Sequence, residues 1–294
     1  MEKPEINRRN FITKTALGTL GAAGIITSCK GPENKKDEVL LPELRDEAPD
    51  GKIIKAGLIG CGGRGTGAAI NFLDAGPNLQ IFALGDVFQD KIDNCRAKIK
   101  EEQNVEVADE NCFIGFDAYQ KVIDSGVDLV LLCTPPHFRP AHVEAAINAR
   151  KHVFMEKPCA VDPVGARSVL ASSKKAEALG LCMVSGTIRR VQKDYMETQR
   201  RVTNGEIGEI TGANIIRNGG ALWVRKPRPE WSEMEYMLRN WVNFCWLSGD
   251  HITEQFIHEV DVMNWYMGQN PTLAIGWGGR QRRITGDQYD FFSI

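Results

Sequence analysis

The chain has 294 residues, with 36 basic and 38 acidic side chains and a formal net charge of −2. This balance offers no broad electrostatic attraction for nucleic acid or for an anionic membrane surface. The length suggests two domains, and no apolar run approaches the ~20 residues of a membrane-spanning helix. The eight cysteines form no C-x-x-C pair and no zinc-like spacing, so we expect free thiols, no disulfide framework and no metal site.

The first fifty residues have the pattern of an export signal followed by a linker. Arg8-Arg9 precedes an apolar stretch rich in Gly and Ala, which ends at Ser28-Cys29. This order is similar to a twin-arginine signal with a lipoprotein box in residues 1–29, and it predicts export to the periplasmic side with a lipid anchor on Cys29. A short amphipathic helix with two chance arginines is the alternative. Residues 30–50 are charged and proline-containing, as expected for a linker.

A dinucleotide-binding turn is predicted at the start of the folded chain. A strand over residues 52–59 leads into Gly60-Cys61-Gly62-Gly63-Arg64-Gly65, and a helix is expected over residues 66–73. Between a strand and a helix, the first glycine permits a tight turn, the second lets the backbone approach a pyrophosphate, and the third permits close helix packing. The helix N-terminus adds free N–H groups. The predicted cofactor-binding residues here are Gly60, Gly62, Gly63, Arg64 and Gly65.

Asp86 is the candidate ligand for the adenosine ribose. It follows a second predicted strand, residues 79–84, and lies about twenty residues beyond the glycine motif, where a carboxylate binds the ribose 2′-hydroxyl. A carboxylate would repel a 2′-phosphate, so we expect NAD rather than NADP. Asp86 could instead cap the helix that begins near Gln89, and the two roles are compatible.

The alternation of strands and helices continues to about residue 186. Strands are expected over residues 127–133, 151–155 and 181–185, with helices over 140–149 and 162–179. This pattern predicts an α/β fold with a doubly wound parallel sheet in residues 51–186. Ligands of such sheets bind at the carboxyl ends of the strands. The segments Thr134-Pro135-Pro136-His137 and Glu156-Lys157-Pro158 follow two of these strands, so we expect them beside the glycine loop.

From residue 52 onward the sequence resembles the Gfo/Idh/MocA oxidoreductases. The matching features are the glycine motif, Asp86, Thr134-Pro135-Pro136 with His142 downstream, Glu156-Lys157-Pro158, the segment 204–210 and a helix over 249–268. The resemblance implies an NAD-binding Rossmann domain and a C-terminal α+β domain, residues 187–294, with an open, mostly antiparallel sheet. Relatives continue beyond Ile294, so we expect an incomplete second domain and a homo-oligomer at full length. It also implies cofactor contacts from Thr134, Pro135, His137, His142, Glu156 and Lys157.

Two regions supply candidate catalytic residues. Lys157 follows a strand at the predicted cofactor site, where a cation can polarise a substrate oxygen and keep a neighbouring base deprotonated. The resemblance places it beside the nicotinamide. A surface lysine is the alternative.

The helix predicted over residues 249–268 carries His251, Glu254, His258 and Asp261 on one face. Family members have D-x-x-x-H here, which implies that His258 is the base and that Glu254 replaces the aspartate. A buried polar network, which suits His251 and Asp261, and a metal site are the alternatives. We expect no metal, because hydride transfer to NAD requires none.

A strand is expected over residues 207–217, and a substrate loop between it and the 249–268 helix. This loop contains four tryptophans and three arginines, which suit the apolar faces and polar edges of a sugar. Plain packing or an oligomer interface is the alternative. The candidate substrate residues are Arg190, Lys193, Trp223, Trp241 and Asp261.

Three functions fit these patterns. The first is an NAD-dependent oxidoreductase that takes hydride from a sugar, polyol or glycoside hydroxyl with tightly bound NAD. The second is a redox-neutral, NAD-dependent glycosidase, and the third is a non-catalytic, lipid-anchored sugar-binding protein.

Overall fold

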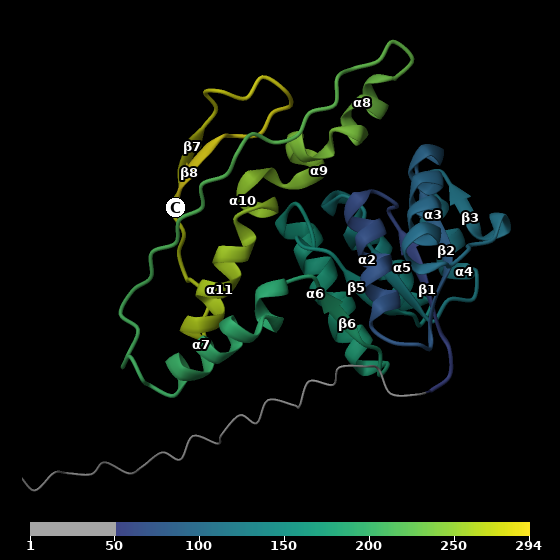
Figure 1. The fold of residues 1–294 in the computed structure, drawn as a ribbon. Coiled ribbons are helices and arrows are strands. Elements are labelled where there is room, and N and C mark those ends of the chain that lie inside the picture. Colours follow the sequence, from purple (N-terminus) through teal and green to yellow (C-terminus); the bar gives the residue numbers. More distant parts are fainter. Residues whose placement is uncertain (1–50) are drawn as a thin grey trace, which may run out of the picture. The chain divides into compact units, whose positions relative to one another are not determined.

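The computed structural model describes residues 51–294, so the predicted export signal and linker lie outside the described residues. From residue 54 to residue 185 strands and helices alternate, as predicted, and the strand 112–114 and the helix 118–124 add to the predicted elements (Figure 1). The strands are β1 (Ile54–Ile59), β2 (Leu79–Asp86), β3 (Cys112–Ile114), β4 (Leu129–Leu132), β5 (His152–Met155) and β6 (Met183–Ser185).

The six strands form one parallel sheet in the order β3-β2-β1-β4-β5-β6. Strands β2 and β3 follow on one side of β1, and β4, β5 and β6 follow on its other side, so the direction in which strands are added reverses between β3 and β4. In such sheets the crevice at this reversal, outside the carboxyl ends of β1 and β4, binds dinucleotides. The predicted fold class is confirmed.

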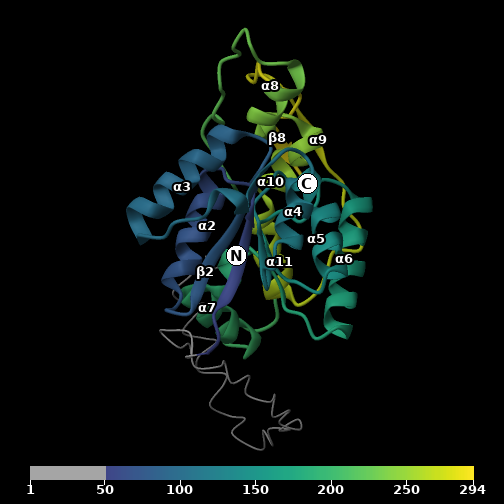
Figure 2. The ribbon, with the colours of Figure 1, turned by 90° about the vertical axis from the view of Figure 1, so that its right-hand side faces the viewer.

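Helices cover both faces of the sheet, and each face has its own apolar core (Figure 2). On one face, Leu58 and Leu131 pack with residues of α2 and α3. On the other, Val130 and Leu132 pack with residues of α4, α5 and α6. Side chains alternate between the faces along a strand, so β4 supplies both cores. These helices are α2 (Gly63–Asp74), α3 (Gln89–Gln103), α4 (Ala118–Asp124), α5 (Arg139–Asn148) and α6 (Pro163–Ala178).

The remaining described residues are mainly short helices and irregular chain. Strands β7 (Trp277–Gly279) and β8 (Phe291–Ser293) form a two-stranded antiparallel sheet. All described residues belong to one compact unit, and the domain division at residue 186 stays a prediction. No helix within residues 51–294 has the length and apolar character to cross a membrane. The helices are α7 (Lys193–Thr203), α8 (Glu233–Arg239), α9 (Cys245–Ser248), α10 (Asp250–Glu254) and α11 (Ile257–Met267).

The strand predicted over residues 207–217 is wrong, because this segment is irregular. Ile207 and Ile216 are 69% and 74% exposed, and no described strand pairs with the segment. An apolar, β-branched sequence does not form a strand without a partner for its backbone groups.

The single helix predicted over residues 249–268 is also wrong, because the structure has two helices with a break after Glu254. The Glu254 carbonyl oxygen accepts a hydrogen bond from Lys157 Nζ at 2.6 Å. The amides of Gln255 and Phe256 both turn back to the His251 carbonyl, at 2.9 and 3.1 Å. The regular bonding of the helix is therefore interrupted where Lys157 takes the Glu254 carbonyl. Gly268, with φ of 68°, ends α11 at the predicted position.

Candidate active site

The glycine loop connects β1 to α2, and two of its glycines are required by neighbouring backbone. Gly60 has φ of 96°, and a Cβ there would lie 2.7 Å from the Thr134 amide nitrogen. A Cβ at Gly65 would overlap the Gly60 carbonyl oxygen. Helix α2 begins at Gly63 rather than at Thr66, so Gly65 lies in its first turn. These two glycines let the helix approach the ends of β1 and β4.

Gly62 and Gly63 face open space instead. A Cβ at either position would meet no atom within 4 Å. Gly62 is the N-cap of α2, so the first amides of the helix have no intrahelical acceptor. Free N–H groups beside an open, side-chain-free surface fit the pyrophosphate of a dinucleotide. The residues present therefore suit NAD.

Asp86, the last residue of β2, faces the same space. Its carboxylate accepts hydrogen bonds from the amides of Cys61, at 2.7 Å, and Phe88, at 3.0 Å. Burial raises the pKa of this carboxyl group above its ordinary value, and the two amides oppose the shift. The alternative role as a helix cap is wrong, since the N-cap of α3 is Phe88 and has no side-chain cap bond. Asp86 instead links the glycine loop to the end of β2.

A cavity of about 430 Å³ lies over these residues, a volume in the usual range for small-molecule sites. The glycine loop, Asp86, Thr134, Pro135 and His142 line it, all of them predicted cofactor residues. Phe88, Lys91, Phe116 and Tyr119 also line it and were missed by the sequence reasoning, although Phe88 and Lys91 could have been suspected because they follow Asp86 closely.

His142 is buried in the wall of this cavity. Its ring stacks on Tyr119, with ring centres 4.2 Å apart, and its Nδ1 lies 3.4 Å from the Thr134 hydroxyl. Burial, with a further contribution from Arg139, lowers the pKa of His142 to about 4. The imidazole is therefore neutral near pH 7, and it suits a structural or hydrogen-bonding role better than a charged one.

Three predicted cofactor residues, His137, Glu156 and Lys157, do not line the cavity. Glu156 forms an ion pair with Arg64, at 2.7 Å, and so joins the end of β5 to the glycine loop. His137, in the 3₁₀ turn Pro136–Phe138, packs edge-on against Trp246 with ring centres 5.1 Å apart. Arg64 itself lines the cavity.

Lys157 and Glu254 form the central polar contact beyond the cavity. Lys157 Nζ lies 2.8 Å from the Glu254 carboxylate, and both side chains are largely buried. Together with the bond to the Glu254 carbonyl, this contact fixes the ammonium group at the end of β5. The carboxylate pairs with Lys157, and no hydrogen bond joins it to His258 among the described residues.

His258, on α11, lies in an electrostatic environment that favours the neutral base. Burial lowers the pKa of its imidazole, and the charges of Lys157 and Arg189 lower it further. Sequence reasoning missed Arg189 and Arg217, which both pair with Glu259 beside His258, at 2.8 and 3.0 Å. Arg189 adjoins the predicted Arg190, whereas nothing in the sequence singles out Arg217.

The predicted substrate residues fall into two groups. Arg190 and Asp261 bind each other through paired hydrogen bonds of 2.9 to 3.0 Å, and Lys193 is exposed at the start of α7. Trp223 and Trp241 pack edge-on, with ring centres 6.4 Å apart, and line the dinucleotide cavity instead. Within residues 51–294, no three His, Cys, Asp or Glu side chains come together as a metal site.

The sheet order, the glycine loop and Asp86 define an NAD-binding Rossmann domain. Residues 54–184 match the model of the Gfo/Idh/MocA family, described as the oxidoreductase family with an NAD-binding Rossmann fold.

Three known proteins illustrate the similarity. Myo-inositol 2-dehydrogenase of Thermotoga maritima is 27% identical over 74% of this chain and 55% of its own length. D-glucoside 3-dehydrogenase of Escherichia coli is 29% identical over 43% of this chain and 36% of its own. The structure of scyllo-inositol dehydrogenase from Lactobacillus casei with bound NAD(H) and scyllo-inositol has a TM-score of 0.53 at 23% identity, over 74% of this chain and 57% of that one. The chain spans about half the length of the inositol dehydrogenases.

Proposed function

We propose that the protein is an NAD-dependent oxidoreductase that oxidises a secondary hydroxyl of a sugar, polyol or glycoside. The observation that carries this proposal is the buried Lys157–Glu254 ion pair at the end of β5, next in the sheet to the strand that precedes Thr134. Glu254 is the last residue of α10, and α11, which carries His258, begins three residues later at Ile257. The names of the related inositol and glucoside dehydrogenases support a polyhydroxylated substrate.

The side chains divide the reaction between them. Lys157 donates a hydrogen bond to the substrate oxygen and stabilises negative charge as it develops there. His258 accepts the hydroxyl proton, and its lowered pKa keeps it unprotonated for this step. When bound, NAD⁺ would supply the acceptor for the hydride of the carbon that bears this hydroxyl. The products are a ketone, NADH and one proton, which His258 passes to water.

The test is hydride transfer by the full chain. NAD⁺-loaded protein is mixed with a panel of inositols, free sugars and glycosides, and NADH absorbance is followed. We expect reduction with at least one polyhydroxylated substrate and a primary isotope effect when its carbinol hydrogen is deuterium. No reduction with any of them, despite bound NAD⁺, would favour the non-catalytic sugar-binding protein.

A second candidate is a redox-neutral glycosidase, favoured by the similarity to D-glucoside 3-dehydrogenase. Oxidation at C3 would acidify the C2 proton, whose removal expels the aglycone as an alcohol. Water then adds to the double bond, and return of the hydride to C3 regenerates NAD⁺. Aglycone release without net NADH, with solvent deuterium appearing at C2, would support this course. NADH accumulating in proportion to product would exclude it.

Export and assembly are also proposals. We propose twin-arginine export, lipid attachment at Cys29 on the periplasmic side, and a homo-oligomer. Cys29→Ala should release the protein from the membrane fraction, and replacing Arg8-Arg9 by two lysines should leave it in the cytoplasm. Light scattering of the protein in solution gives its oligomeric state.

A further inference from the structure

We infer that residues 223–241, here called the covering segment, form a second wall of the dinucleotide site, and that Arg225 binds the adenosine half of the cofactor. This inference rests on NAD binding at the glycine loop, as the proposed function does. It adds a binding element outside the Rossmann sheet.

The covering segment faces the carboxyl ends of the strands. Both ribbon views place α8 and α9 at the end of the sheet where the strands terminate (Figures 1 and 2). Five side chains of the segment line the same cavity as the glycine loop and Asp86. A bound dinucleotide in this cavity would therefore lie between the sheet edge and the segment. These side chains are Trp223, Arg225, Leu238, Arg239 and Trp241.

Two buried asparagines hold the first part of the segment in place. The Asn240 side chain accepts a hydrogen bond from the Arg225 amide, at 2.7 Å, and donates one to the Arg225 carbonyl, at 3.2 Å. The Asn243 side chain donates to the Trp223 carbonyl, at 3.1 Å. A buried side-chain amide that satisfies both backbone groups of one residue fixes its position as a neighbouring strand would. Arg225 is thus positioned beside the cavity.

The charge of Arg225 suits the cofactor. Among the ion pairs of the described residues, Arg225 has no carboxylate partner, and its nearest aromatic contact is Trp223, at 5.4 Å. Burial and the nearby charge of Arg225 both lower the pKa of Lys91, on the first turn of α3. Two cations therefore lie near each other at the Asp86 end of the cavity. Such a pair suits the phosphate nearest the adenosine, and a guanidinium also stacks on an adenine ring.

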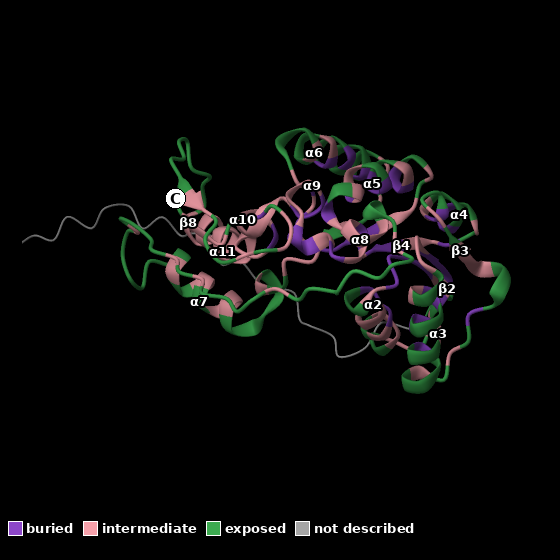
Figure 3. Ribbon diagram, turned by 90° about the horizontal axis from the view of Figure 1, so that it is seen from above, coloured by how far each residue is buried: buried purple, intermediate pink, exposed green. Residues whose placement is uncertain are grey.

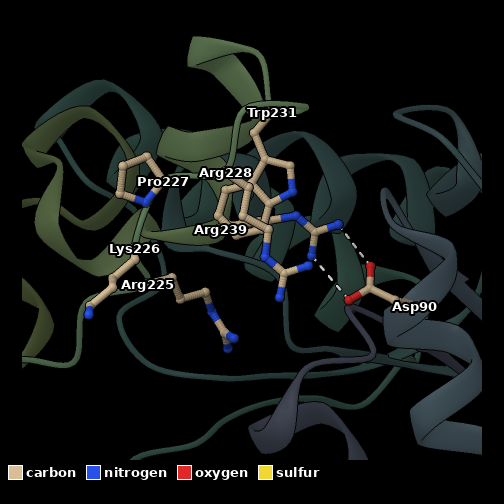
Figure 4. A pocket seen from close by; sticks show the side chains of 7 residues that line it. All are labelled: Asp90, Arg225, Lys226, Pro227, Arg228, Trp231 and Arg239. Atoms are coloured by element: carbon tan, nitrogen blue, oxygen red, sulfur yellow. Dashed lines mark hydrogen bonds and ion pairs between the residues drawn. The ribbon is translucent and has the colours of Figure 1, made fainter.

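Arg239 joins the segment to helix α3 of the Rossmann region (Figure 4). Its guanidinium binds Asp90, on α3, with hydrogen bonds of 2.9 and 3.1 Å, and binds Glu235 at 2.8 Å. It also lies over the Phe88 ring, 3.9 Å from the centre, and only 12% of its side chain is exposed. This contact links residues 149 positions apart, so it keeps the segment closed over the adenosine half of the site.

The outer surface of the segment supplies a matched control. Arg228 lines a second cavity of about 500 Å³, which Arg225 and Arg239 also line, but unlike them it does not line the dinucleotide cavity. Its side chain is 66% exposed and lies 5.1 Å from the Trp231 ring centre. Arg228→Ala removes the same charge from the same segment without touching the predicted cofactor contact.

The experiment measures affinity and release for two ligands. NAD⁺ and ADP-ribose are titrated calorimetrically into the full chain and into its Arg225→Ala, Arg239→Ala and Arg228→Ala variants, and NADH release is timed by stopped flow. Arg225→Ala should weaken both ligands equally, by roughly 10- to 100-fold, as expected for loss of a charge-assisted hydrogen bond. Arg239→Ala should accelerate NADH release, and Arg228→Ala should change neither quantity.

The outcomes separate this inference from the proposed function. Normal NAD⁺ binding by Arg225→Ala, or a loss of NAD⁺ but not ADP-ribose affinity, would overturn the assignment to the adenosine half. If the wild-type chain binds neither ligand, the proposed function fails with it. Asp90→Asn, at a half-exposed position, repeats the Arg239 test without removing the arginine, and unchanged release in both variants would overturn the closing role.

Discussion

Residues 51–186 contain most of the buried residues, and residues 187–294 are mostly intermediate or exposed (Figure 3). Almost every buried apolar side chain of the described chain belongs to the first region. In the second, only Leu238, Val242 and Leu247 are buried, whereas several buried side chains are polar, Asn240, Asn243 and Glu254 among them. The first region therefore rests on apolar packing, and the second on hydrogen bonds and ion pairs, some of which join it to the first.

This difference bears on function, because the candidate active site draws on both regions. The Rossmann region supplies the glycine loop, Asp86 and Lys157. The second region supplies Glu254 and His258, and the Lys157–Glu254 pair joins the two. Buried hydrogen-bonded charges favour one arrangement of the neighbouring chain, since any other leaves a charge unpaired. Polar contacts thus bring the candidate catalytic side chains together, and apolar packing stabilises the Rossmann region on which they meet.

The largest expected effect comes from the base. His258→Asn should lower kcat about 10²- to 10⁴-fold, the usual contribution of a general base, and leave NAD⁺ affinity unchanged. Since the pKa of His258 is lowered, the acid limb of the wild-type rate profile should fall below pH ~6.5. Steady-state kinetics measures kcat and its pH dependence, and calorimetry measures the NAD⁺ affinity. His251→Asn is the control, because His251 stacks on Phe292 instead, and equal losses in the two variants would remove His258 from its role.

The second effect concerns packing in the Rossmann region. His142 has a pKa of about 4, so between roughly pH 6.5 and pH 4 the unfolded chain binds a proton that the folded chain does not. Stability is complete above this window and falls as the pH drops through it. The expected loss between pH 7 and pH 4 is roughly 3 kcal/mol. The His142→Phe variant should lack this pH-dependent loss of stability. The measurement is the free energy of unfolding in urea at a series of pH values, and the same pH dependence in variant and wild type would contradict the prediction.

A smaller effect is expected from the glycines of α2. Gly65→Ala should destabilise the protein by about 1–3 kcal/mol and weaken NAD⁺ binding, because the new methyl group overlaps the Gly60 carbonyl. In the same helix, a Cβ at Gly67 would meet only Arg64 Nη1, at 3.7 Å. Gly67→Ala should therefore stabilise by up to about 1 kcal/mol. Thermal unfolding of both variants checks this, and a similar response from the two would show that the close approach is unimportant.

The smallest effect is expected from a single polar contact of the second region. Asp261→Asn breaks the pair with Arg190, whose side chain is 42% exposed, so the loss should be only about 0.2–1 kcal/mol. High salt should reduce the difference. A loss of several kcal/mol in chemical denaturation would mean that this pair, and not the sum of many contacts, holds α11 in place.

Sequence patterns predicted the Rossmann region well because its signals are local. The glycine motif and the apolar strands each determine the structure of their own neighbourhood. The break after Glu254 could not be predicted in this way, since Lys157 lies 97 residues away and acts only in the folded chain. The position of Trp223 likewise depends on Asn243, and Trp223 and Trp241 face the dinucleotide cavity rather than Lys157. Sequence patterns therefore predict structure least well where polar contacts between residues far apart in the sequence hold the chain in place.

The most direct test of the account is equilibrium binding of NAD⁺ and NADP⁺ to the full chain and to Asp86→Asn. We expect the wild-type protein to bind NAD⁺ at least about tenfold more tightly than NADP⁺, because Asp86 repels a 2′-phosphate, and the variant to lose most of this preference. Tighter binding of NADP⁺ by the wild type, or no binding of either, would contradict the assignment of Asp86 and of the cavity above it.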